Sequence, residues 1–168
     1  IQSKNYNFIS VKEEIEIGAE ASKLITEKHG VYKDPNLTEY VNNLTTKISE
    51  LSEETIIGYK TIILDDSKIS VFSIIGGTIF ITRGYLAELN SEAELCFVLA
   101  REVAHLNNKH GEKRMSENQI DSSILAAGLM AGKKRLKKEW KKMIYALVEQ
   151  VYKGYSNQSE LIADSEAL

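Results

Sequence analysis

The chain has 168 residues, of which 43% are hydrophobic and 27% are charged, with a single proline. This length fits one domain, and the composition is that of an ordinary folded protein, which excludes collagen-like, low-complexity and largely disordered chains. The one cysteine, Cys96, excludes a scaffold of intrachain disulfides. Because no apolar run approaches the roughly 18 residues that a membrane-spanning helix needs, we expect a soluble chain.

Positive charge is concentrated in one segment. The formal net charge is −3, yet residues 133–142 hold seven basic residues and one acidic residue. A basic segment that also contains Trp140 can contact an anionic membrane surface or nucleic acid, although most such runs are solvated helix faces. We therefore keep membrane-surface contact through Lys133–Lys142 as an alternative to a solvated face, and we expect no nucleic-acid partner.

Capping signals and apolar spacing predict the main helices. Residues 10–30 and 34–51 each combine a cap with apolar residues that recur at helical spacing. A third helix is expected from residue 91 to about 115, and a last helix follows the break at 154–156. The capping signals are Ser10 with Glu13, Asp34 with Pro35, and Ser91 with Glu94.

Three short segments between the second and third helices are rich in β-branched and aromatic residues. They cover residues 57–64, 69–74 and 78–82. The pair Gly76 and Gly77 separates the last two and predicts a hairpin. The predicted fold class is therefore α+β, mostly helical, with a small antiparallel sheet of about three strands.

The third predicted helix carries a pattern related to metal chemistry. Residues 101–105 read R-E-x-x-H, which is H-E-x-x-H with its first histidine replaced by Arg101. In H-E-x-x-H the positions i and i+4 share one helix face, so two imidazoles can bind zinc while the glutamate faces the metal-bound water. Alone, such a pattern is usually a surface arginine and glutamate beside a half-buried histidine. Beyond His105, however, Glu160 and Asp164 form E-x-x-A-D on another predicted helix, where a carboxylate ligand and its support would lie.

The order of these motifs along nearly the whole chain resembles the M48 family of zinc metallopeptidases, within the gluzincins. The resemblance is carried by an ordered series rather than by one motif. Its segments are residues 13–18 (EEIEIG), 40–42 (YVN), 72 with 76–84 (F, GGTIFITRG), 89–95 (LNSEAEL), 98–105 (VLAREVAH) and 154–164 (GYSNQSELIAD).

The resemblance implies a thermolysin-like domain that hydrolyses peptide bonds with zinc-activated water. It implies Glu102 as the general base, His105 and Glu160 as zinc ligands, and Asp164 as the residue that orients the first ligand. It also implies an unfolded or extended polypeptide as the partner, in a bacterial cell envelope or periplasm. The strand with Gly77, Thr78, Ile79 and Phe80 would bind this polypeptide by edge pairing, which needs only free backbone groups.

Arg101 departs from the family pattern at the first zinc ligand. A guanidinium has no lone pair to give a metal, and it stays charged, so the zinc expected from the family is opposed here. We expect Arg101 to fill the vacant position and to neutralise Glu160 and Asp164, which leaves a peptide-binding domain with weak or no peptidase activity. His110 is a poor replacement ligand, because it lies about 140° around the helix from His105.

Two alternatives remain open at this point. In the first, the protein is an active zinc endopeptidase in which Arg101 is an introduced substitution. In the second, the protein is a cell-envelope interaction module with a vestigial cleft.

The loop before Gly76–Gly77 departs from the family as well, because the Asn and Pro that the family commonly shows there are absent from residues 70–75. In the family the ligand-bearing helix runs well past the aspartate, whereas this chain stops four residues after Asp164, so we expect residues 1–168 to be a single peptidase domain that is truncated at its C-terminus.

Overall fold

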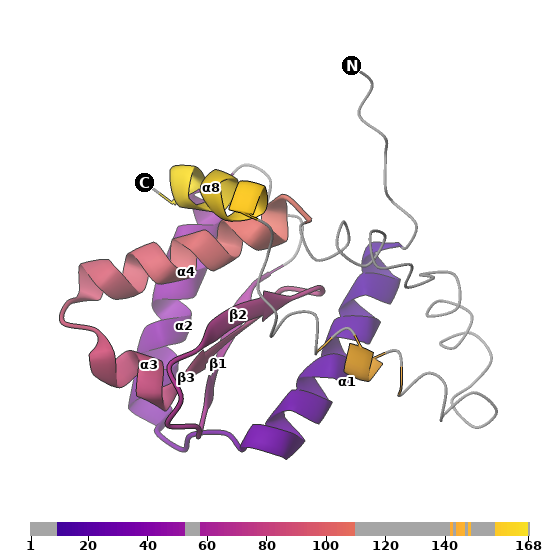
Figure 1. The fold of residues 1–168 in the computed structure, drawn as a ribbon, viewed down its shortest axis with the longest axis horizontal. Coiled ribbons are helices and arrows are strands. Elements are labelled where there is room, and N and C mark those ends of the chain that lie inside the picture. The colour runs from indigo at the N-terminus through magenta and orange to yellow at the C-terminus, as the bar shows by residue number, and fades with distance from the viewer. Residues whose placement is uncertain are drawn as a thin grey trace.

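The structure is a computed structural model that describes residues 10–52, 58–109 and 157–167, with residues 142, 144–146 and 148 (Figure 1). For residues 157–160 it describes the backbone alone. The basic segment 133–142 lies outside the described residues, apart from its last residue. Within the described residues, no helix is both long and apolar enough to cross a lipid bilayer.

The first two helices begin where the capping residues predict. The Ser10 hydroxyl accepts a hydrogen bond from the Glu13 N–H, and the Glu13 carboxylate accepts one from the Ser10 N–H at 2.8 Å. Gly30, with a φ of 74°, ends this helix. The Asp34 carboxylate caps the second helix. The bounds are α1 (Val11–His29) and α2 (Pro35–Glu50).

The helix that carries the R-E-x-x-H pattern is shorter than predicted. Helix α4 (Glu92–Asn107) is capped by Ser91 as expected, but Lys109 has a φ of 51°, which is not helical. The rest of the predicted extension, residues 110–115, lies outside the described residues. A short helix, α3 (Arg83–Glu88), precedes α4 and was not predicted. The last helix, α8 (Asn157–Glu166), lies where the sequence predicts it.

The sheet has three described strands in the order β1-β3-β2, which are β1 (Lys60–Leu64), β2 (Val71–Ile74) and β3 (Thr78–Thr82). Strands β2 and β3 form the predicted antiparallel hairpin. Strand β1 instead runs parallel to β3, so the sheet is mixed rather than wholly antiparallel. The difference arises because β3 inserts between the two strands that precede it in the chain. The α+β fold class is confirmed.

The outer edge of β1 is covered by side-chain and backbone groups. The Asn42 amide of α2 donates to the Thr61 carbonyl and accepts from the Thr61 N–H, both at 2.9 Å. The Tyr32 N–H donates to the Ile63 carbonyl at 2.9 Å. Asn42 therefore takes the place of a neighbouring strand and satisfies backbone groups that an open edge would expose.

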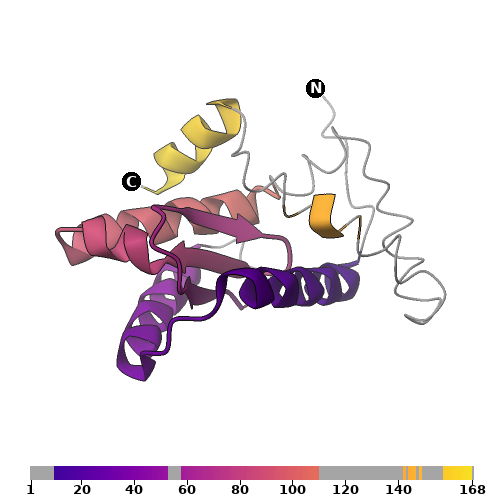
Figure 2. The ribbon, with the colours of Figure 1, turned by 60° about the horizontal axis from the view of Figure 1, so that its bottom comes forward.

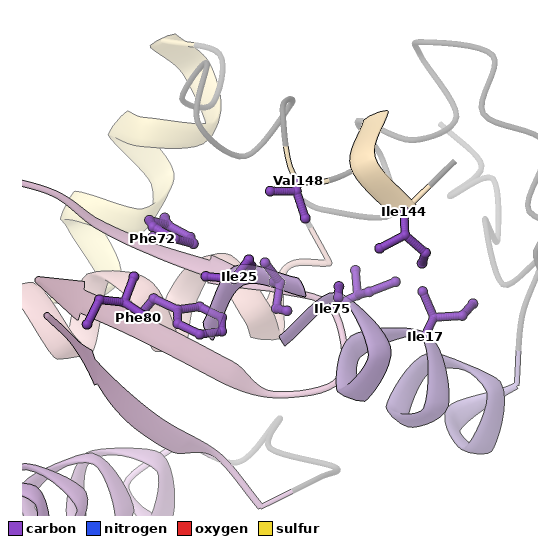
Figure 3. Packing of buried hydrophobic residues seen from close by; sticks show 10 residues of the cluster. Ile17, Ile25, Phe72, Ile75, Phe80, Ile144 and Val148 are labelled. Carbon is purple, nitrogen blue, oxygen red and sulfur yellow. The ribbon is translucent and has the colours of Figure 1, made fainter. Parts of the chain in front are cut away.

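The two faces of the sheet are covered by different helices. Side chains alternate along each strand, so Ile79 and Ile81 of β3 face α2 and α4, whereas Phe80 faces α1. Figures 1 and 2 show α1 on one side of the sheet and α4 on the other. On the α1 side, the Phe80 and Phe72 rings stack with centroids 5.2 Å apart, next to Ile25, Ile75 and Val148 (Figure 3). On the other face, the packing of Ile79 and Ile81 against α4 fixes this helix on the sheet and so positions the candidate site.

Candidate active site

Helix α4 presents Arg101, Glu102 and His105 at very different depths. Glu102 is 2% exposed and His105 is 1% exposed, whereas the Arg101 side chain is 27% exposed. The periodicity of the helix explains the difference between neighbours, because successive residues point about 100° apart. The buried pair sits on the side of α4 that packs on the molecule, and Arg101 lies toward α8.

Arg101 contacts α8, as expected from the sequence. Its Nε donates to the Asp164 Oδ1 at 2.7 Å, and its Nη1 lies 3.7 Å from the Glu102 Oε1. Residues 101 and 164 come together because α8 packs along α4, an arrangement visible in both views (Figures 1 and 2). The guanidinium thus lies between a buried acid of its own helix and a half-exposed acid of another.

Burial dominates the electrostatics of Glu102. Loss of solvation raises the pKa of this carboxyl to about 7, although the hydroxyl and backbone of Ser73 and the charge of Arg101 act in the opposite direction. Ser73 belongs to β2 and is fully buried. Sequence reasoning missed Ser73, because only the strand register reveals that it faces α4.

The other predicted ligand positions are described in part. Glu160 lies on α8 one turn before Asp164, but its side chain is outside the described residues. Among the side chains that the structure describes, no group of three or more His, Cys, Asp and Glu is arranged to hold a metal ion. The described ionisable groups of the site are the His105 imidazole, the Arg101 guanidinium, and the carboxyls of Glu102 and Asp164.

The structure corrects the predicted mode of peptide binding. Gly77, Thr78, Ile79 and Phe80 were expected to offer a free strand edge, but β3 is the central strand and pairs on both sides. The Gly77 carbonyl also accepts a hydrogen bond from the Lys60 N–H at 3.0 Å. Edge pairing at these residues is wrong, because their backbone groups are already bonded within the sheet.

A second polar contact between α4 and α8 was not predicted. The Asn108 Nδ2 donates to the Glu166 Oε2 at 2.6 Å and to the Ala104 carbonyl at 2.9 Å. Ala163 of α8, next to Asp164, is fully buried. No sequence motif marks Asn108, and only the end of α4 at Asn107 places its side chain beside α8.

The sequence pattern of peptidase family M48 matches residues 32–168. The chain belongs to peptidase family M48. The match includes the sheet, α4 and α8, and so contains every residue of the candidate site. M48 is a family of metallopeptidases, which is the class of hydrolase that the sequence predicts. The assignment also agrees with the resemblance that the ordered motifs indicate.

Bacterial relatives of this M48 chain share low sequence identity with it. It is 26% identical over 121 residues to a candidate beta-barrel assembly-enhancing protease of Vibrio cholerae, which covers 72% of this chain. It is 23% identical over 122 residues to the beta-barrel assembly-enhancing protease of Yersinia pestis, and 20% identical over 122 residues to that of Escherichia coli K12, each covering 73% of this chain. In each case the matched region is 25% of the relative, so the chain corresponds to about a quarter of these proteins.

Proposed function

We propose that this chain is an M48 metallopeptidase domain in which Arg101 has impaired the zinc site, so that it binds extended polypeptide and hydrolyses it weakly or not at all. The observation that carries the proposal is the 2.7 Å hydrogen bond from the Arg101 Nε to Asp164. An arginine that points to solvent would have left the metal position vacant. This arginine instead points toward α8, where the ligand-bearing motif lies.

The zinc that the family implies does not fit the residues present. A catalytic zinc site takes three protein ligands and a water, and the first of the three positions here holds a guanidinium. That group donates hydrogen bonds only, and its charge repels a divalent cation. His105 and Glu160 are the remaining candidate ligands, which is one fewer than such a site needs.

A pKa near 7 would suit Glu102 as a general base, but under this proposal no metal-bound water lies within its reach. A general base must be ionised near the operating pH and within reach of the proton it takes. Here the carboxyl is 2% exposed, and its pKa is raised to about 7 by burial. Without a metal-bound water, Glu102 has no acidic proton to accept, and we assign it a structural part in the unaltered chain.

Binding of polypeptide, and a place in the bacterial cell envelope or periplasm, are proposed from the relatives. Their names describe proteases that enhance β-barrel assembly. Because the chain matches only a quarter of their length, neither substrate nor partner follows from the match alone. Contact of the basic segment with a membrane surface stays a prediction, which salt-sensitive binding to anionic liposomes would test.

A casein digestion assay tests the proposed impairment. We expect no zinc-dependent cleavage by the unaltered chain, and a gain of cleavage in Arg101→His that chelators abolish. The matched control is the same histidine variant with Glu102→Gln, which keeps the new imidazole but should lose the gained activity. Chelator-sensitive cleavage by the unaltered chain at the rate of Arg101→His would instead show an active zinc endopeptidase and refute the proposal.

A further inference from the structure

One guanidinium stands between acids of two helices that are distant in sequence. Arg101 lies 2.7 Å from Asp164 of α8 and 3.7 Å from Glu102 of α4. We infer that Arg101 takes the structural place of a metal cation and holds α8 against α4, so that this junction is stable without metal. The inference rests on the proposed loss of zinc binding and extends it to the stability of the fold.

Helix α8 needs an external partner. It has ten residues, and isolated helices of that length are marginal in water. Its C-terminal end carries Asp164 and Glu166, with no basic residue in the last turn. Negative charge near a helix C-terminus opposes the helix dipole. A cation supplied from α4 therefore offsets a charge arrangement that α8 cannot balance itself.

The contacts between α4 and α8 show which group supplies that charge. Ala163 is fully buried, so α8 is packed and not merely adjacent. Asn108 binds Glu166 at 2.6 Å but is neutral, whereas Arg101 brings a full positive charge to Asp164. The Arg101 and Asp164 side chains are 27% and 48% exposed, so the arginine, but not the acid, is clearly shielded from solvent.

The chain contains a matched surface pair for comparison. The Arg83 Nε lies 2.7 Å from the Asp65 Oδ1, the same atoms and distance as in the Arg101–Asp164 pair. Here the arginine is 47% exposed, and the pair joins the start of α3 to the loop after β1. Surface pairs of this kind contribute little to stability. Arg83→Ala is thus the control that removes an equivalent contact away from α8.

Amide hydrogen exchange of the purified chain, measured in EDTA, tests the inference. In Arg101→Ala we expect exchange at residues 161–167 to rise at least about tenfold while α1 is unchanged, because the helix opens locally. Asp164→Asn should have a similar effect, and the double variant should add little to either single change. Arg101→Lys, which keeps the charge but loses the planar donor, should give a smaller rise, and Arg83→Ala none at α8.

Two results would overturn the inference. One is unchanged exchange in α8 for both Arg101→Ala and Asp164→Asn, and the other is equal acceleration of α1 and α8. Neither result would touch the proposed function. That proposal would fail on a different observation, namely faster exchange in α8 of the unaltered chain when EDTA is added, because such a change requires a bound metal.

Discussion

Glu102 is a carboxyl in a position where ionisation is costly. It is 2% exposed, and its pKa is raised from 4.5 to about 7, chiefly by burial. Between these two pH values the folded chain holds a proton that the unfolded chain has released. Glu102 therefore contributes stability that is fully present below about pH 4.5 and is lost as pH rises through about 7.

Glu102→Gln should remove this pH dependence. The amide keeps the shape of the protonated carboxyl and does not ionise. As pH rises from 4.5 to 8, we therefore expect the free energy of unfolding of the variant to increase by on the order of 3 kcal/mol relative to that of the unaltered chain. Urea unfolding at several pH values measures it, with the exposed Glu39→Gln as control. The lowered pKa values of Glu13 and Asp66 act in both chains and cancel in the comparison. An equal slope in both chains would contradict the assignment.

Some site contacts follow from the sequence and others do not. The contact between Arg101 and Asp164 could be predicted, because the family resemblance implies that Asp164 lies beside position 101 and because opposite charges pair. The role of Ser73 could not, because it depends on which face of β2 packs on α4. Asn108 was missed for a similar reason, since its contact depends on where α4 ends.

Helix α1 lies unusually close to the hairpin turn between β2 and β3. A Cβ atom on Gly18 would lie 2.1 Å from the Ile75 carbonyl oxygen, and one on Gly76 would lie 2.8 Å from the Glu14 carbonyl oxygen. Both obstacles are backbone atoms, which cannot rotate away. The two glycines therefore set the distance between the helix and the turn, in a region that the family resemblance marked without explaining.

Gly18→Ala should push α1 away from the sheet. We expect a loss of about 2 kcal/mol in free energy of unfolding, because overpacking outweighs the higher helix propensity of alanine. Chemical denaturation measures the loss. Gly58→Ala is the matched control, since no atom lies within 4 Å of its added Cβ, and it should change stability by less than about 0.5 kcal/mol. Equal effects of the two changes would contradict the close packing.

The amide of Asn42 covers the edge of β1. Asn42→Ala would leave the Thr61 N–H and carbonyl without these two 2.9 Å bonds, so we expect a loss of about 1–3 kcal/mol in free energy of unfolding. The neighbouring Asn43 is exposed, and Asn43→Ala serves as the control. Faster amide exchange at Thr61 in the first variant alone would support the edge role, and no difference between the variants would refute it.

Local signals predict elements better than they predict how elements pair. Three helix caps were correct, because each cap is a contact within four residues. The six-residue α3 was missed, since one and a half turns carry little periodicity. The parallel pairing of β1 with β3 was also missed, because strand order is decided by packing on both faces of the sheet rather than by the strands' own residues.

At the scale of the whole molecule, two apolar layers hold the sheet between α1 on one side and α2 with α4 on the other. Helix α8 lies outside these layers and is attached to α4. Neither Arg101 nor Asp164 belongs to these layers, which explains how a site altered at Arg101 is compatible with an intact domain.

The zinc content of the purified chain, compared with that of Arg101→His, tests the central claim most directly. Both proteins are prepared with zinc present, freed of loosely bound metal by gel filtration, and measured by elemental analysis. We predict fewer than about 0.1 zinc ions per unaltered chain and about one per Arg101→His chain, since the imidazole restores the third ligand. One tightly bound zinc ion per unaltered chain would contradict the claim that Arg101 occupies the metal position.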